Sequence, residues 1–74
     1  MKVKVFEDGK SQRIVLLLRQ GYSMDILDQQ DQAIASTLQA RDGFLLEEQL
    51  YQYGIDVGLA IPQLITNGYF ICNQ

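Results

Sequence analysis

The sequence predicts a single small α+β domain, and three patterns in it indicate that class. Two strand-like segments flank an Asp-Gly pair, helix-like segments fill the middle, and a run of strand-forming residues stands near the C-terminus. Seventy-four residues make one domain, near the lower size limit for a self-sufficient core. We expect a β-hairpin over residues 1–20, a helical pair over 23–54, and a C-terminal helix or strand with a terminal strand over 56–74.

The N-terminal hairpin is predicted from alternation and from a turn signal. Lys2 to Val5 alternates charged with apolar residues, Asp8-Gly9 is a favoured hairpin turn, and a second strand follows over Ile14 to Leu18. This second strand is apolar on both faces, as expected of a strand covered on both sides. We expect the chain's own helices on one face and a second copy on the other, and therefore a homodimer. A competing interpretation is a helix over residues 12–20, which its Val and Ile residues disfavour.

Two helices are predicted between residues 23 and 54. Ser23 caps the first, which is expected to reach about Ala40. Asp42 caps the second, and Gly54 ends it in a left-handed conformation. The apolar stripe of the first helix consists of Leu27, Ile34 and Leu38, and that of the second of Leu46, Leu50 and Tyr53.

The C-terminal part admits two interpretations. Asp56 caps a short segment, and Asn67-Gly68 precedes the strand Tyr69 to Cys72. Either Pro62 to Thr66 is a strand that pairs with Tyr69 to Cys72 across the Asn-Gly turn, or it is the end of a helix that leads into that strand. Pro62 restricts both interpretations, because proline is tolerated in a helix only near its start, and in a strand only at a sheet edge or at the first position.

Two stretches resemble families of DNA-binding regulators. The order helix, glycine turn, helix, Asn-Gly and strand over residues 46–72 resembles the helix-turn-helix core of winged-helix regulators. Residues 56–68, in the position of the recognition helix, offer one Asp, one Gln, one Asn and no cation. Residues 4–16, KVFEDGKSQRIVL, are similar to the opening of swapped-hairpin antitoxins and AbrB-type regulators. That resemblance implies an interleaved dimer with Lys10 and Arg13 facing nucleic acid.

The composition excludes several chemistries. The chain has one cysteine and no histidine, so a disulfide within one chain, the common Cys/His zinc sites and histidine-based catalysis are all excluded. We therefore expect no enzyme, no catalytic residue, no metal and no cofactor. No apolar run is long enough to span a bilayer, and a soluble, cytoplasmic protein is expected.

Charge is distributed unevenly, and it suggests two binding surfaces. Residues 1–19 hold five basic and two acidic residues, which gives +3, and residues 20–74 hold one basic and seven acidic residues, which gives −6. The expected function is a small regulator or inhibitor, of bacterial or phage type, that binds a basic or apolar protein surface. Its candidate residues are an acidic helix face with tyrosine anchors: Asp25, Asp28, Asp31, Tyr51 and Tyr53. The alternative is DNA binding through the basic residues of the hairpin: Lys2, Lys4, Lys10, Arg13 and Arg19.

Overall fold

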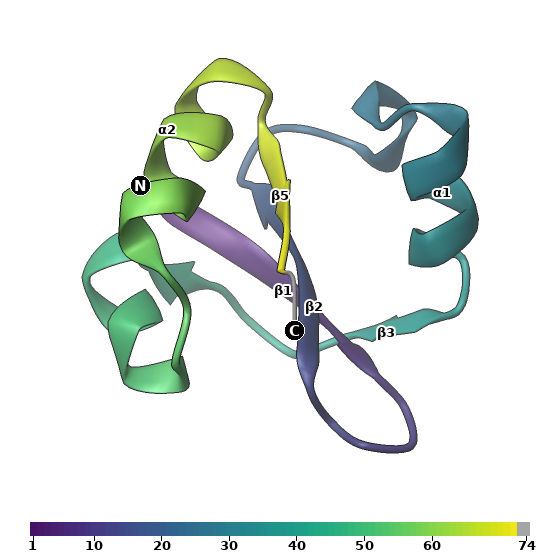
Figure 1. Ribbon diagram of the computed structural model, residues 1–74, viewed down its shortest axis with the longest axis horizontal. Coiled ribbons are helices and arrows are strands. Elements are labelled where there is room, and N and C mark those ends of the chain that lie inside the picture. Colours follow the sequence, from purple (N-terminus) through teal and green to yellow (C-terminus); the bar gives the residue numbers. More distant parts are fainter. Residues whose placement is uncertain (73–74) are drawn as a thin grey trace.

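The predicted hairpin is the centre of a five-stranded antiparallel sheet, shown in Figure 1. The structure is a computed structural model that describes residues 1–72. In chain order the elements are β1 (Lys2–Asp8), β2 (Ile14–Arg19), the 3-10 helix η1 (Met24–Ile26), α1 (Gln29–Ala35), β3 (Leu38–Ala40), β4 (Leu45–Leu46), the 3-10 helix η2 (Glu47–Tyr53), α2 (Val57–Thr66) and β5 (Tyr69–Ile71). The sheet order is β3-β1-β2-β5, and β4 pairs with the other end of β1.

The hairpin itself is confirmed. β1 and β2 pair antiparallel with Val5 opposite Leu17, and Asp8 and Arg13 close the turn through a backbone hydrogen bond of 2.9 Å. Gln12 takes a φ of 60° inside this turn. The competing helix over residues 12–20 is wrong, because the backbone groups of this segment pair across the sheet.

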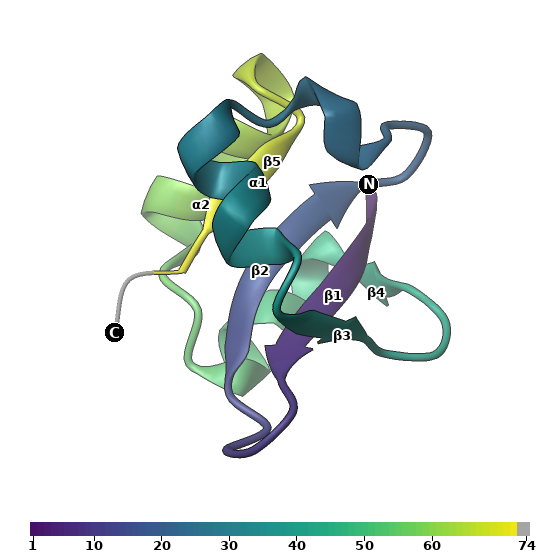
Figure 2. The same cartoon turned by 90° about the vertical axis from the view of Figure 1, so that its right-hand side faces the viewer.

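Both faces of β2 are covered by the chain itself, since α1 and α2 lie on opposite sides of the sheet (Figures 1 and 2). Leu17 is fully buried on the side of η2 and α2, where it packs with Leu50 and Leu64. Leu16 is fully buried on the side of η1 and α1. The two-sided burial is as predicted, but α1 provides the cover that we expected from a second copy. Homodimerisation therefore stays a prediction without this support.

The single helix expected from Ser23 to about Ala40 is wrong. The chain forms η1, then an extended residue at Leu27 with a ψ of 147°, then α1, then the strand β3. Asp28 caps α1 by accepting a hydrogen bond of 2.8 Å from the N–H of Asp31. The helix therefore starts after Leu27, the first residue of the predicted apolar stripe. The backbone of Leu38 pairs with that of Asp8, and this sheet pairing outweighs the helical pattern of the segment.

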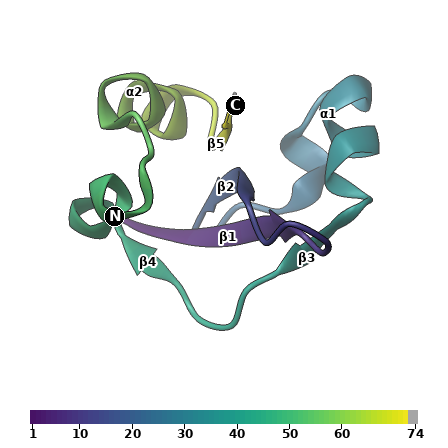
Figure 3. The ribbon, with the colours of Figure 1, turned by 60° about the horizontal axis from the view of Figure 1, so that its bottom comes forward.

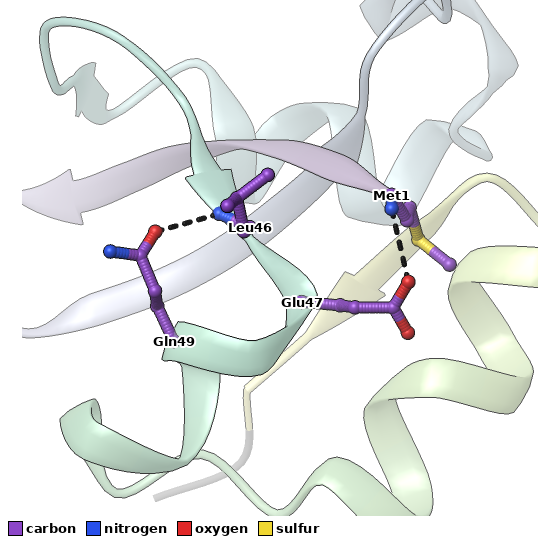
Figure 4. Close-up of polar contacts among 4 residues, drawn as sticks. All are labelled: Met1, Leu46, Glu47 and Gln49. Atoms are coloured by element: carbon purple, nitrogen blue, oxygen red, sulfur yellow. Dashed lines mark hydrogen bonds and ion pairs between the residues drawn. The ribbon is translucent and has the colours of Figure 1, made fainter.

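The second helix begins later than expected and is a 3-10 helix. Asp42 lies in the loop between β3 and β4 and caps nothing. The N–H of Leu46 is bound instead by Gln49 Oε1 at 2.9 Å, and the Met1 ammonium group pairs with Glu47 at 3.0 Å (Figure 4). These two contacts fix the start of η2 against the first residue of the chain.

Two cap predictions are confirmed, and together they set where η2 ends and α2 begins. Gly54 ends η2 with a φ of 77°, in the left-handed region. Asp56 caps α2 by accepting the N–H groups of Gly58 and Leu59 at 3.0 and 3.3 Å. Of the predicted face of η2, only Leu50 is buried, while Leu46 and Tyr53 are exposed.

The helical interpretation of Pro62 to Thr66 is confirmed, and the hairpin interpretation is wrong. Pro62 lies inside α2, where it donates no hydrogen bond to the Gly58 carbonyl group. Packing of the buried Ala60 and Leu64 on the sheet compensates for that loss. β5 then pairs with β2, which is already the centre of the sheet.

Candidate functional site

The edge formed by β5 is the accessible edge of the sheet. β5 is the last strand in the sheet order, and within residues 1–72 no other strand pairs with its outer side. Figure 3 shows β5 between α1 on one side and α2 on the other. The opposite side of the sheet ends in two very short strands, β3 and β4, which share the outer side of β1.

A groove of about 490 Å³ runs between α1 and α2 along β5. Its walls carry apolar side chains: Ile34 from α1, Ile55 from the loop before α2, and Leu59 from α2. Ile34 and Leu59 are 37% and 58% exposed, and both line this one hollow. The groove is therefore a mixed surface, with polar and apolar side chains, that no described part of the chain covers.

The rim of the groove is acidic. Asp31 and Asp56 line it, and none of its lining residues is Lys or Arg. Asp31 accepts a hydrogen bond of 2.6 Å from the hydroxyl group of Tyr69, which ties α1 to β5. This bond, followed by burial and the charges of Asp31 and Asp28, raises the pKa of Tyr69 to about 12. The phenol of Tyr69 thus stays neutral at physiological pH.

Cys72 lies at the floor of the groove and is buried. Burial raises the pKa of its thiol to about 11, so the thiol stays protonated at neutral pH. A protonated thiol is a poor nucleophile and a poor metal ligand. Within residues 1–72, no group of three His, Cys, Asp or Glu side chains is placed to hold a metal ion.

The three aspartates that we expected on one helix lie on two: Asp25 is in η1, whereas Asp28 and Asp31 lie together at the start of α1. Asp25 accepts a hydrogen bond from the Ser23 hydroxyl group in η1, and Asp28 caps α1. Only Asp31 reaches the groove. The single helix expected to carry them is wrong, because Leu27 is extended between η1 and α1, and the binding role of the three aspartates stays a prediction.

The two tyrosines lie on the other side of the sheet, on η2. Tyr51 lines a separate shallow hollow with Val57 and Ile61. The ring of Tyr53 lies beside Arg41, with the guanidinium carbon 5.7 Å from the ring centre. Neither tyrosine lines the groove that Asp31 lines, and their joint use in binding a partner stays a prediction.

The five basic residues of the hairpin do not share one surface either. Lys2 and Lys4 lie on the face of β1 that α1 partly covers, whereas Arg19 pairs with Val3 and lies on the other face. Lys10 and Arg13 lie at the exposed hairpin turn. The hairpin also has both long sides paired, to β3 and β4 and to β5, which leaves no open side for the interleaving that the swapped-hairpin resemblance implies.

Sequence reasoning missed Ile34 and Leu59. Ile34 fits an apolar stripe, and such a stripe is ordinarily core. The sequence of α2 did indicate an exposed apolar surface, because apolar residues occupy all sides of this helix: Val57, Leu59, Ala60, Ile61, Leu64 and Ile65. A helix that is apolar all round is normally covered all round, yet Val57, Leu59 and Ile65 are exposed.

No family model, curated protein or solved structure matches this chain. Within residues 1–72, no helix combines the length and the apolarity that a membrane crossing requires.

Proposed function

We propose that the protein acts by binding a partner protein in the groove between α1 and α2, and that it is a regulator or inhibitor rather than an enzyme. One observation carries this proposal: exposed aliphatic side chains from two separate elements converge on one hollow with an acidic rim. The expected partner surface is apolar with basic residues around it. The proposal includes the cytoplasm as the compartment and a bacterial or phage source.

The two exposed aliphatic side chains of the groove supply part of the binding free energy. Burying a fully exposed large aliphatic side chain in an interface contributes about 1.5 to 3 kcal/mol to the binding free energy. Leu59 and Ile34 are only partly exposed, so each contributes less. Two such side chains contribute about 2 to 3 kcal/mol together, before hydrogen bonds and ionic contacts are counted. The remaining affinity depends on the rim and on the backbone of β5.

The test is selection of short random peptides, displayed on phage, against the immobilised protein. Recovered peptides are expected to bind the wild type and to lose binding to the Leu59→Glu variant, which adds a charge inside the groove. Ile65→Glu is the matched control, because Ile65 lies on the same helix, is 57% exposed and does not line the groove. Recovery of no peptide, or of peptides that still bind Leu59→Glu, would contradict the proposal.

Nucleic-acid binding is the second candidate, and a feature of the opposite sheet edge favours it. Lys4 lies over the ring of Phe44 at 5.3 Å, Arg41 lies beside Tyr53, and Phe44 and Tyr53 line one shallow hollow. Exposed aromatic rings next to cations are the usual platform for unstacked bases. The DNA-binding residues proposed from the sequence (Lys2, Lys4, Lys10, Arg13 and Arg19) would contribute phosphate contacts.

Titration of single-stranded and duplex DNA at two salt concentrations tests this second candidate. Binding that weakens steeply with salt and is lost in a Lys10→Ala, Arg13→Ala double variant would favour it. Tyr53→Ala is expected to weaken single-strand binding, and Tyr51→Ala serves as control because Tyr51 lies on the same helix outside that hollow. Absence of binding at low salt would leave the groove as the functional surface.

A further inference from the structure

We infer that the partner enters the groove as an extended segment and joins the sheet as an additional strand beside β5. This inference rests on the proposed function, and it specifies the conformation and the chemistry of the partner segment. The occupant is a short stretch that is apolar on both of its faces and carries Lys or Arg next to that stretch.

The backbone of β5 supplies the first argument. Cys72 N–H donates to the Val15 carbonyl group at 2.7 Å, and Arg19 N–H donates to the Gly68 carbonyl group at 2.8 Å. In an antiparallel pair, residues alternate between those that face the neighbouring strand and those that face away. Gly68, Phe70 and Cys72 therefore face β2, and the N–H and C=O groups of Tyr69 and Ile71 point outward along the groove.

The two walls supply the second argument. An added strand lies about 4.8 Å from β5, and its side chains point alternately to the two faces of the sheet. Side chains on one face would meet Ile34 of α1, and those on the other face would meet Leu59 of α2 and Ile55, which precedes that helix. A segment with apolar residues at successive positions fits this site, whereas an amphipathic strand would place polar side chains against one wall.

Charge complementarity supplies the third argument. Asp31 lines the groove on the α1 side and Asp56 lines it on the α2 side. Both carboxylates still have free acceptor capacity after their bonds to Tyr69 and to the start of α2. Lys or Arg in the partner can therefore pair with them, and an acidic segment is repelled.

A second copy of this chain is a poorer occupant for the same reasons. Pairing β5 with β5 of another copy would bring two concave surfaces together. It would also place acidic rims against acidic rims. The groove suits a convex, basic segment, and the described residues of this chain present none that is unpaired and extended.

The experiment uses the peptides recovered by phage display. Strand addition predicts a consensus with consecutive apolar positions and a flanking Lys or Arg. It also predicts that backbone N-methylation of the recovered peptide weakens binding at every second residue, by about tenfold at each sensitive position, because only alternate N–H groups face β5. In the protein, Ile71→Pro removes one outward N–H and Ile71→Ala keeps it, so the proline variant should bind about fivefold to tenfold more weakly than the alanine variant.

The outcomes separate this inference from the proposed function. Peptides that bind in the groove with a helical spacing of apolar residues, or with no alternation in the N-methylation series, would refute strand addition and keep the groove as the binding site. Recovery of no groove-dependent peptide refutes both. A wild-type dimer that Leu59→Glu dissociates in sedimentation equilibrium would show that a second copy is the occupant, and would also refute the inference. The N-methylation series changes only the peptide, so it tests strand addition even if Ile71→Pro fails to fold.

Discussion

Replacing Leu16 and Leu17 by alanine, one at a time, tests whether the chain alone covers both faces of β2. The two residues are neighbours, both are 0% exposed, and they point to opposite faces. Leu→Ala removes the transfer free energy of about three carbon groups and leaves a cavity, which together cost about 3 kcal/mol. A chain of 74 residues has a total stability of about 4 to 11 kcal/mol, so each variant loses a large share of it.

Urea denaturation at two protein concentrations measures these losses. We expect similar losses for Leu16→Ala and Leu17→Ala and an unchanged dependence of free energy on urea. Ile65→Ala is the control for an exposed aliphatic residue and should change stability by less than about 0.5 kcal/mol. If Leu16→Ala costs less than about 1 kcal/mol, then α1 does not cover that face in solution as described. Midpoints that rise with protein concentration would show self-association and support the predicted homodimer. Leu→Val at the same positions gives the same comparison if the alanine variants do not fold.

Three other predictions concern the surroundings of the groove. Gly68→Ala should destabilise the protein by about 1 to 2 kcal/mol in thermal unfolding, because Gly68 has a φ of 86° and an added Cβ would lie 2.5 Å from the Tyr22 ring; an unchanged melting temperature would contradict this. Asp56→Ala should cost about 1 kcal/mol in urea unfolding through loss of the α2 cap, while Asp56→Asn should cost much less. Tyr69 contributes stability that is complete below pH 10 and is lost as the pH rises towards 12, because its folded-state pKa lies above its unfolded value. NMR titration of the Tyr69 ring should show the pKa falling towards 10 in Asp31→Ala, and an unshifted titration there would contradict the assigned cause.

The sequence was sufficient for the elements whose signals are local. The hairpin follows from the Asp8-Gly9 turn and the alternation before it, and the start of α2 follows from Asp56. The strand at Tyr69 follows from its strand-forming residues after a glycine. In each case, the residues that specify the element lie within a few positions of it.

The elements that were missed depend on contacts between distant residues. β3 and β4 are three and two residues long, too short for a periodic pattern, and they exist because their backbones pair with β1. Without β3, nothing in the segment indicates that the helix of Ile34 must end before Leu38. The same holds for the groove, since the distance between Ile34 and Leu59 is set by the sheet that lies between their helices.

The interrupted outer strand beside β1 determines how many partners the sheet can take. β3 and β4 meet β1 at opposite ends, and the loop between them leaves no straight run of backbone on that side that another chain could extend. Within residues 1–72, β5 is the sheet edge with unpaired outward backbone groups, so in the inferred complex a bound segment adds one strand to the sheet and ends it there. The expected complex is monovalent, with one partner segment for each copy of the protein.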